Sequence, residues 1–455
     1  MPLVSKNPTT ENEIERYSLH TDREIEQRLA QAMSGFETNR DRSFGERAAR
    51  LERAADLLED RAPALGALMT EEMGKPLPQA RAEAEKCAWV CRYYAEHGAD
   101  FLADQAVETP AQKSYVAHEP LGPILAVMPW NFPFWQAFRF GAPALMAGNV
   151  VLLKHAPNVT GCAEAIADVL RGAGFADHEL QVLRVDEETV GTILEDRRVR
   201  GATLTGSVPA GAAVAQQAAA QLKPTVLELG GSDPFIVCAD ADLEEAASTG
   251  CTARMQNNGQ SCIAAKRFIV TRAVLDDFRE RLVENVAALT VGDPTNDATD
   301  VGPMARGDLR DTVHDQVERA LGDGAVAVTG GHMLERDGFF YAPTVLADVE
   351  PGTVAFEEEI FGPVASITAA DDAEHAVALA NNTRFGLGGS IFTEDLEKGE
   401  RMARALEAGC VFVNEMTKSD PRVPFGGIKD SGYGRELSHH GIHEFVNVKT
   451  VWVEG

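Results

Sequence analysis

Short apolar runs alternate with alanine-rich stretches between residues 120 and 230, and this alternation constrains the fold more than any other feature of the chain. The apolar runs have the length of buried strands, and the intervening stretches, such as 160–173 and 208–221, have the composition of helices. We therefore expect strand–helix units on a parallel sheet. The expected strands are Ile124–Met128, Val150–Leu153, Leu180–Val185, Ala202–Thr205 and Thr225–Leu229.

A second α/β region begins near residue 231, after residues 10–110, which read as helices. Its expected strands are Phe235–Cys238, Arg267–Thr271, Val364–Thr368 and Val411–Asn414, and its expected helices are 273–290, 372–381 and 395–407. Two further segments, 104–118 and 445–453, are each expected to form an exposed strand. Exposed strands of this kind often complete the sheet of a partner subunit.

The composition is that of an ordinary soluble protein, with 44% hydrophobic and 25% charged residues, and 455 residues allow two or three domains. A formal net charge of −28 argues against non-specific binding to nucleic acid or an anionic membrane. No apolar run reaches the ~18 residues of a membrane span, and no signal-peptide pattern is present. The seven cysteines are scattered and no metal-binding cluster is recognisable, so we expect a cytoplasmic protein with reduced thiols and no metal.

Four residues suited to ligand binding lie at or just beyond the ends of expected strands: Pro129, Lys154, Gly206 and Glu228. Ligands of parallel α/β sheets bind at the carboxyl ends of the strands. A lysine there can reach a ribose or phosphate, or it can simply extend its ammonium to solvent. The L-T-G-S run at 204–207 precedes an expected helix whose first N–H groups could meet a pyrophosphate, although this run alone is a weak signal.

Cys262 differs from the other cysteines in its surroundings. It ends the run N-N-G-Q-S-C, whose glycine and polar residues place the thiol on a loop. A lone cysteine is more often a structural apolar residue. As a thiolate, however, it could attack an aldehyde carbonyl, and hydride transfer from the resulting hemithioacetal to a nicotinamide would leave a thioester.

Two further side chains would complete such a mechanism. Glu228 ends the apolar run T-V-L-E, and it would be either a structural carboxylate that accepts backbone hydrogen bonds or a general base whose pKa is raised by burial. Asn131, in P-W-N-F-P, would be either a helix N-cap or, with the backbone N–H of Cys262, a donor to the developing oxyanion. A nucleophile, a base and an oxyanion donor together suit the oxidation of an aldehyde through a thioester.

These motifs, in this order and spacing, resemble the NAD(P)-dependent aldehyde dehydrogenase superfamily over essentially the whole chain. The markers are P-W-N-F-P at 129–133, L-E-L-G-G at 227–231, G-Q-S-C at 259–262, E-E-I-F-G-P at 358–363 and P-F-G-G-x-K-x-S-G-x-G-R-E at 424–436. The resemblance implies Cys262 as nucleophile, Glu228 as base and Asn131 as oxyanion donor.

The resemblance also implies a cofactor site. Its residues are Trp130, Lys154, Pro157, Gly206, Ser207, Leu229, Glu359 and Phe361. Lys154 and Glu359 match the positions that hold the two riboses, and Phe361 matches the aromatic residue near the nicotinamide ribose. Gly206 and Ser207 match the pyrophosphate turn.

The fold that the family implies is α/β, with a Rossmann-like parallel-sheet cofactor domain, an α/β catalytic domain and a small β oligomerisation domain. On this sequence the cofactor domain comprises 1–103 and 119–229, and the catalytic domain comprises 230–436. The bridging segments are 104–118 and 437–455. Such a β-domain implies a homodimer or homotetramer.

One position departs from many NAD-preferring members of the family. The third residue after the matching lysine is often a glutamate that binds the adenosine 2′-hydroxyl, and here it is Pro157. Loss of that acid removes the repulsion of a 2′-phosphate, while proline supplies no phosphate partner. We therefore expect both NAD and NADP to be accepted.

Substrate choice should lie on the helix after Asn131, where Trp135 and Arg139 are four and eight residues further on. Arg139 would be either a core arginine paired with an acid or a bidentate clamp for a carboxylate at the far end of a short aldehyde. By resemblance, Ser419 and Lys418 belong to the opposite wall. The runs K-H-A-P-N, L-E-L-G-G-S-D-P and K-S-D-P-R are similar to the shorter bacterial succinate-semialdehyde dehydrogenases, which implies succinate semialdehyde as substrate.

Three other functions compete with this one. A broad-specificity aliphatic aldehyde dehydrogenase would keep the same three catalytic residues. A CoA-acylating aldehyde dehydrogenase would not need Glu228, and a non-catalytic binding protein would usually have lost the nucleophile or the base.

Overall fold

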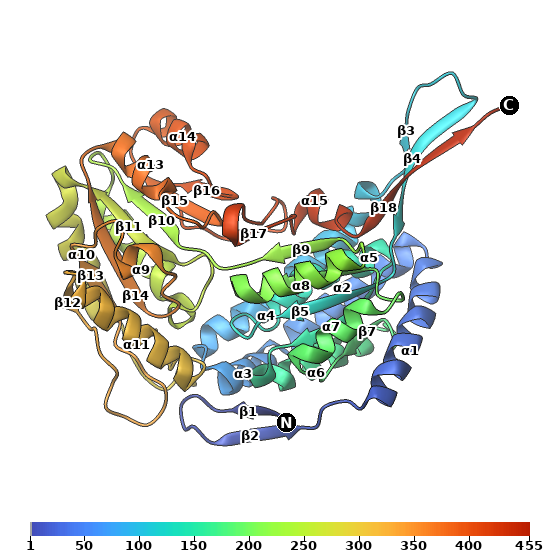
Figure 1. The fold of residues 1–455 in the computed structure, drawn as a ribbon, viewed down its shortest axis with the longest axis horizontal. Coiled ribbons are helices and arrows are strands. Elements are labelled where there is room, and N and C mark those ends of the chain that lie inside the picture. Colours follow the sequence, from blue (N-terminus) through green and yellow to red (C-terminus); the bar gives the residue numbers. More distant parts are fainter. Residues whose placement is uncertain (1) are drawn as a thin grey trace.

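The computed structural model describes residues 2–455 and contains two α/β units that lie side by side (Figure 1). One unit has a six-stranded sheet in the order β17 (Gly432–Tyr433), β9 (Thr225–Glu228), β8 (Gly201–Thr205), β5 (Pro123–Met128), β6 (Val150–His155) and β7 (Leu180–Val182). Its strands β9, β8, β5, β6 and β7 are parallel, and β17 is an antiparallel edge. The parallel sheet predicted for 120–230 is therefore confirmed.

The second unit has a seven-stranded sheet. Its order is β12 (Val326–Thr329), β13 (Thr344–Ala347), β14 (Val364–Ala370), β11 (Ala265–Thr271), β10 (Asp233–Val237), β15 (Gly388–Phe392) and β16 (Cys410–Val413). Only β12 pairs antiparallel in this sheet. The predicted α/β class is confirmed for this half of the chain as well.

Helices cover both faces of the six-stranded sheet, because successive side chains of a strand point to opposite sides. On β5, Ile124 and Ala126 belong to one apolar core, while Leu125 belongs to another. The first core is formed with α2 (Phe44–Asp60), α3 (Ala62–Met73), α4 (Leu77–Phe101), α5 (Trp135–Ala147) and α6 (Thr160–Gly172). The second is formed with α1 (Asp22–Arg40), α7 (Glu187–Glu195) and α8 (Val208–Ala220).

The seven-stranded sheet is covered in the same way. On β10, Phe235 and Val237 pack against α9 (Leu243–Met255) and α10 (Leu275–Ala287). Ile236, between them, faces the opposite core. That core is formed with α11 (Gly307–Gly322), α12 (Val354–Glu357), α13 (Ala373–Asn381) and α14 (Leu396–Ala405).

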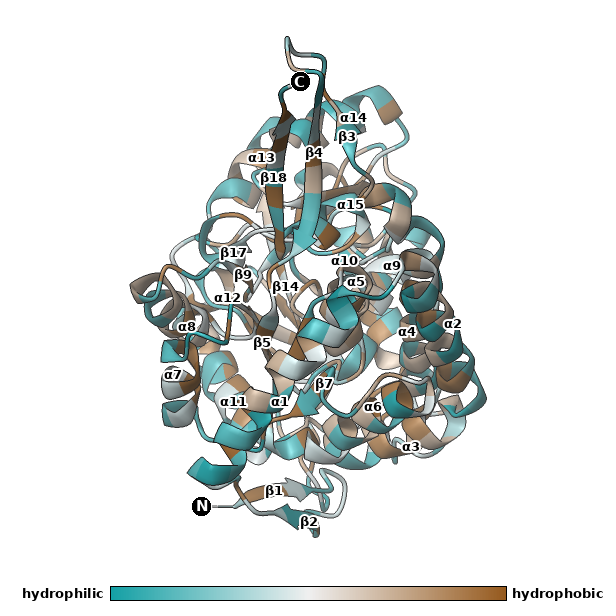
Figure 2. Cartoon of the chain, turned by 90° about the vertical axis from the view of Figure 1, so that its right-hand side faces the viewer, coloured by the Kyte–Doolittle hydropathy of each residue, from teal (hydrophilic) through white to brown (hydrophobic). Residues whose placement is uncertain are grey.

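A three-stranded antiparallel sheet projects from the body of the molecule (Figures 1 and 2). Its strands are β18 (Val446–Val453), β4 (Lys113–Pro120) and β3 (Gln105–Ala106), so both segments predicted as exposed strands form them. The short helix α15 (Ser438–His443) precedes β18. Val448 and Trp452 expose 63% and 51% of their surface on this arm, which leaves apolar area uncovered in the single chain.

Some elements differ from the sequence prediction. The region predicted as helical from residue 10 contains β2 (Glu13–Tyr17), which pairs with β1 (Leu3–Lys6). Only Ile14 and Tyr17 of β2 are half-buried, and the other three residues are exposed and charged, so the strand shows no clear period of two. The helices α9 and α11 and the strands β12, β13 and β15 were not predicted, and of these α9 carries only weak apolar periodicity.

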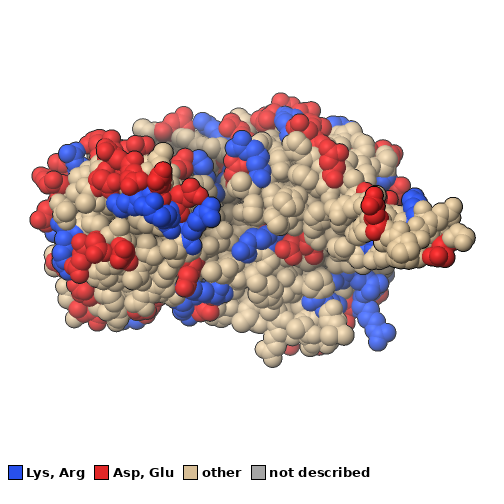
Figure 3. All heavy atoms as spheres, turned by 90° about the horizontal axis from the view of Figure 1, so that it is seen from above, with Lys and Arg blue, Asp and Glu red and all other residues tan. Residues whose placement is uncertain are grey.

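Acidic and basic side chains are mixed across the face seen from above, with acidic groups on both α/β units (Figure 3). None of the helices formed by residues 2–455 has the length and apolar character of a membrane span.

The two units meet where β9 of the first sheet continues through Gly230 and Gly231 into β10 of the second. β17 returns to this junction and pairs Gly432 with Glu228. The residues that follow β5, β8 and β9 therefore share a cavity with Cys262, Glu359 and Phe361 of the second unit.

Candidate active site

Two cavities meet at Cys262. Each has a volume of about 260 Å³, and Cys262 lines both of them. One cavity is bounded by α4, α5 and the segment 416–419, and the other by the ends of β5, β8 and β9 together with Glu359 and Phe361. The Cys262 thiol can therefore contact one molecule bound in the first cavity and another bound in the second.

The thiol of Cys262 lies on a turn between α9 and β11, so the predicted loop position is confirmed. The turn begins with the 3-10 helix η2 (Gln256–Gly259), in which Asn257 and Asn258 have φ angles of 54° and 58°. Asparagine tolerates this left-handed conformation because its side chain can form local hydrogen bonds. The amide of Asn257 donates to Gln260 O (3.0 Å), and that of Asn258 donates to Gly74 O and Pro303 O (2.8 Å each).

A buried arginine fixes the other side of the same turn. Arg254 donates to Gly259 O (3.1 Å), Ile360 O (2.9 Å) and Val364 O (2.5 Å), and it also contacts Gly362 O. Gly259 has a φ of 72°, and a Cβ there would collide with the Gly362 backbone. Glycine is therefore required at this position, and the segment 359–364 is held against the turn that carries Cys262.

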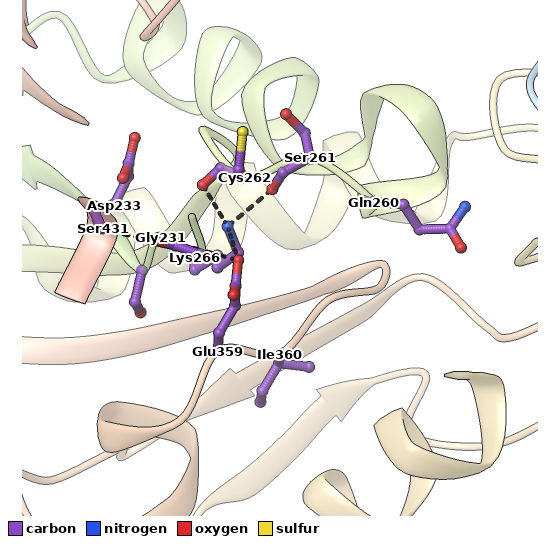
Figure 4. A network of polar contacts seen from close by, with 12 residues as sticks. Gly231, Asp233, Gln260, Ser261, Cys262, Lys266, Glu359, Ile360 and Ser431 are labelled. Atoms are coloured by element: carbon purple, nitrogen blue, oxygen red, sulfur yellow. Dashed lines mark hydrogen bonds and ion pairs between the residues drawn. The ribbon is translucent and has the colours of Figure 1, made fainter. Parts of the chain in front are cut away.

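Lys266 connects the nucleophile turn to Glu359 (Figure 4). Its ammonium donates to the carbonyl oxygens of Ser261 and Cys262 (2.8 Å each) and lies 3.3 Å from Glu359 Oε1. The same carboxylate oxygen accepts from the Gly231 N–H (3.1 Å). The buried ammonium of Lys266 thus binds both the backbone that carries the Cys262 thiol and Glu359, which is predicted to bind a ribose.

Burial raises the pKa of the Cys262 thiol to about 12, while Arg139 and Lys266 lower it. The thiol is therefore protonated at neutral pH in the chain alone, and any added positive charge beside it would favour the thiolate. All seven cysteines are free thiols; Cys262 and Cys410 are half-buried and the other five are buried.

Asn131 lies beside the nucleophile turn. It is 4% exposed, and its side-chain amide donates to Gln260 O at 3.1 Å. The helix that follows begins at Trp135 and has Phe134 in the N-cap position, so the N-cap alternative for Asn131 is wrong. The first N–H groups of that helix are instead bound by a carboxylate from α4, because Glu83 accepts from Phe134 N and Trp135 N (2.9 Å each).

Glu228 is the last residue of β9 and is 2% exposed. Neither of its carboxylate oxygens has a hydrogen-bond partner among residues 2–455, so the alternative of a structural carboxylate held by backbone N–H groups is wrong. Burial raises the pKa of Glu228 to about 8; Arg139 lowers it and Glu436 raises it. A buried, unpartnered carboxyl that titrates near neutrality has the properties of a general acid–base group.

Arg139 lines the first cavity and forms a buried ion pair with Glu436. The two side chains are 2% and 4% exposed, and the guanidinium lies 4.6 Å from the centre of the Phe425 ring. The arrangement is that of a core arginine paired with an acid, which was one of the two alternatives for this residue. Its clamp role stays a prediction.

The other predicted substrate residues also line this cavity. Trp135 belongs to the first turn of α5, and Lys418 and Ser419 belong to the opposite wall. Lys418 pairs with Glu415 at 2.5 Å, and Ser419 accepts a hydrogen bond from Lys86 at 2.9 Å. All four predicted substrate residues therefore line one cavity.

Six of the predicted cofactor residues line the second cavity: Trp130, Gly206, Ser207, Leu229, Glu359 and Phe361. Ser207 is the N-cap of α8 and accepts from Ala210 N (3.4 Å), so the start of that helix borders the cavity. Gly206 has open space at its Cβ position apart from an ordinary contact with Leu204. Room beside a helix start suits an anionic group such as a pyrophosphate.

Lys154 and Pro157 lie outside that cavity, at the end of β6 and in the 3-10 helix η1 (Pro157–Val159). Lys154 is 8% exposed and has no ion-pair partner among the described residues, and burial lowers its pKa. Pro157 is exposed. An unpaired, buried ammonium beside an exposed neutral residue fits the ribose and 2′-phosphate end of a nucleotide.

Several residues of the site were not predicted. They are Lys86, Glu83, Arg254, Lys266 and Glu436. Four of them are charged residues of ordinary helical or turn-rich segments, where single charges usually face solvent. Only Lys266, which follows Cys262 in C-I-A-A-K and is the second residue of a fully buried strand, carried a signal: a lysine inside an apolar strand must be paired.

The chain is similar to known proteins over its whole length. The model of the aldehyde dehydrogenase family matches residues 2–451. A probable succinate-semialdehyde dehydrogenase [NADP(+)] of Synechocystis sp. is 51% identical, and succinate-semialdehyde dehydrogenase [NADP(+)] 1 of Mycobacterium tuberculosis is 52% identical, each over 100% of both chains. The crystal structure of succinic semialdehyde dehydrogenase from Streptococcus pyogenes, in complex with NADP+, is 35% identical and superposes with a TM-score of 0.97 over 100% of both chains. The predicted family is confirmed: the chain belongs to the aldehyde dehydrogenase family.

Proposed function

We propose that this chain oxidises succinate semialdehyde to succinate, with Cys262 as nucleophile and Glu228 as base. The observation that carries this proposal is the position of Cys262 between two cavities, one lined by cationic side chains and the other by the predicted cofactor residues. The relatives named as succinate-semialdehyde dehydrogenases support the choice of substrate.

The reaction begins at the thiol. Cys262 releases its proton to solvent water, and its sulfur attacks the aldehyde carbon, which forms the C–S bond of a hemithioacetal while the carbonyl π electrons move to the oxygen. The oxygen that becomes negative accepts hydrogen bonds from the side-chain amide of Asn131 and the backbone N–H of Cys262. Asn131 is suited to this role because its amide already lies on the nucleophile turn, at Gln260 O.

A nicotinamide bound in the second cavity supplies the acceptor for the hydride that leaves the hemithioacetal carbon. The cavity fits such a group, with Trp130 and Phe361 packed edge to face at a centroid distance of 5.8 Å and Glu359 beside them. Glu359 would hold a ribose there, and Lys154 and Pro157 would border the adenosine ribose.

Hydrolysis of the thioester requires the base. Glu228 removes a proton from water, the oxygen attacks the thioester carbon, and the C–S bond breaks to release succinate and the Cys262 thiolate. The burial of Glu228 and its lack of partners keep its pKa near the range where it can both accept and release a proton.

NADP is the proposed cofactor, with NAD also accepted. The relatives carry NADP(+) in their names, and Pro157 leaves no acid to repel a 2′-phosphate. We also propose a cytoplasmic homodimer or homotetramer that assembles through the projecting arm, because Val448 and Trp452 expose apolar surface there.

The test is NADPH or NADH formation with succinate semialdehyde, propanal and butanal, each with both cofactors. The proposal expects a kcat/KM for succinate semialdehyde at least about 10-fold above that for butanal, since a paired carboxylate contributes more than ~1.4 kcal/mol. Equal kcat/KM values for succinate semialdehyde and for the uncharged aldehydes would indicate a broad-specificity aldehyde dehydrogenase instead. Formation of an acyl-CoA when CoA is added would instead show acyl transfer.

A further inference from the structure

Four cationic side chains line the substrate cavity, and three of them already have a carboxylate partner. The pairs are Lys75 with Glu83, Arg139 with Glu436, and Lys418 with Glu415. The fourth cation, Lys86, takes part in no ion pair among residues 2–455. Lys86 is therefore the cavity cation whose charge is not compensated by the protein.

Neutral groups hold the ammonium of Lys86. It donates to Ser419 Oγ at 2.9 Å and lies 4.3 Å from the centre of the Trp135 ring. These contacts bring together α4, α5 and the 416–419 wall, all of which line the cavity. A cation–π contact and one hydroxyl acceptor orient an ammonium without neutralising it.

The other charged groups around Lys86 do not neutralise its ammonium. Burial lowers its pKa to about 8, and Arg139 on α5 lowers it further, while Cys87, Glu83 and Asp420 raise it. Two carboxylates in this set are already engaged, because Glu83 pairs with Lys75 and Asp420 lies 2.5 Å from Arg422. An incoming carboxylate would find a protonated Lys86 at neutral pH and no competing acid.

We propose that Lys86 is the residue that selects a carboxylate at the far end of the aldehyde substrate, in concert with Ser419. The ammonium of Lys86 donates to one oxygen of the substrate carboxylate. The oxygen of Ser419 accepts from Lys86, so the Ser419 hydroxyl can donate its hydrogen to the other carboxylate oxygen. Arg139 contributes a donor at the same end of the cavity, but its charge is balanced by Glu436. The inference rests on the proposed function.

The first experiment compares K86M and K86R with the wild-type chain, using succinate semialdehyde and butanal. Methionine retains the unbranched stem, so K86M should fold. K86M should raise the KM for succinate semialdehyde about 10- to 100-fold and leave kcat and the KM for butanal within about 2-fold, since a charge-assisted hydrogen bond is lost only by the charged substrate. K86R should recover most of the affinity.

K398M is the matched control, because Lys398 pairs with Asp240 on the second unit and lies outside both cavities. It removes one positive charge and should leave all constants unchanged. An unchanged KM for succinate semialdehyde in K86M, or an equal rise for both aldehydes, overturns the inference.

Inhibition by succinate separates this inference from the proposed function. Succinate should compete with propanal in the wild-type chain, and its inhibition constant should rise about 10-fold in K86M, because the dicarboxylate occupies the same pocket whether or not succinate semialdehyde is the natural substrate. A wild-type chain without preference for succinate semialdehyde, but with Lys86-dependent inhibition, refutes the proposed function and retains the carboxylate site. Inhibition that is equal in wild type and K86M refutes the site.

The pH dependence gives a third readout. Because the pKa of Lys86 is lowered to about 8, the ammonium loses its proton as pH rises through that value. The kcat/KM ratio of succinate semialdehyde to butanal should fall over this range in the wild-type chain and stay flat in K86R, since arginine stays protonated. A ratio with the same pH profile in both chains contradicts the assignment.

Discussion

Arg139 and Glu436 form an ion pair that is almost completely removed from solvent, at the boundary between the substrate cavity and the general base. The pair influences both catalytic groups, because Arg139 lowers the pKa of Glu228 and of Cys262, and Glu436 raises the pKa of Glu228. Substitutions of Arg139 therefore act on the folded state and on the chemistry as well as on substrate affinity.

We predict that R139L destabilises the chain by about 3–5 kcal/mol, because it leaves the Glu436 carboxylate buried without a partner. The double variant R139L/E436L should recover most of this loss, since it removes both charges. Urea denaturation of the wild-type, single and double variants measures the effect. If the double variant is as unstable as R139L, the loss arises from packing against Phe425 rather than from the unpaired charge.

The same substitution should also lower the rate on uncharged aldehydes. In R139L the pKa of Glu228 and of Cys262 rises, so less carboxylate and less thiolate are present at neutral pH. A pure clamp residue would affect only the KM for the carboxylate-bearing substrate. Measurement of kcat for butanal in R139L therefore separates an electrostatic role of Arg139 from a clamp role.

Glu228 should determine the pH dependence of thioester hydrolysis. Its carboxyl has a pKa raised to about 8, and only the ionised form can act as base, so the steady-state rate should increase as pH rises from about 7 to about 9. E228Q should reduce that rate by at least about 100-fold and abolish its pH dependence, while one equivalent of reduced cofactor still forms in a burst. Loss of the burst in E228Q would place Glu228 in acylation instead.

The sequence predicted the strand-end residues well, and the reason is physical. Buried parallel strands must be apolar along their length, so Lys154 and Glu228 stood out as charged residues at the ends of β6 and β9. Parallel strands end at a common edge, which brings Asn131 after β5 and Glu228 at the end of β9 together, whereas Cys262 reaches this junction on the turn before β11 of the second sheet. The division of the chain into domains and the roles of these residues stay predictions.

The remaining site residues could not be read from the sequence. Lys86 lies on the long helix α4, on which Glu85, Glu96 and Asp100 are exposed, and Glu436 lies in a turn-rich segment. Their partners, Ser419 and Arg139, are hundreds of residues away, so only the fold shows that these charges meet in one cavity. For Arg139 the sequence offered two alternatives, and the paired carboxylate of Glu436 comes from the other end of the chain, while the clamp role stays a prediction.

Lys266 should control the reactivity of the nucleophile. Its ammonium binds the Ser261 and Cys262 carbonyls and lowers the pKa of the Cys262 thiol. K266M should slow alkylation of Cys262 by iodoacetamide about 10-fold at pH values below the thiol pKa, because loss of the ammonium raises that pKa and leaves less thiolate. K266R, which keeps the charge, is the control. A reduced rate with an unchanged pH profile would indicate a displaced turn rather than a change in ionisation.

Pro157 offers a direct test of cofactor choice. P157E should raise the KM for NADP by about 10- to 100-fold, because a carboxylate at this exposed position repels a 2′-phosphate and can accept a hydrogen bond from a 2′-hydroxyl. The KM for NAD should stay the same or fall. P157Q has a similar side chain without the charge, so it should affect the two cofactors alike. Equal effects of P157E on both cofactors would mean that the 2′-position lies away from η1, and that Lys154 alone sets the preference.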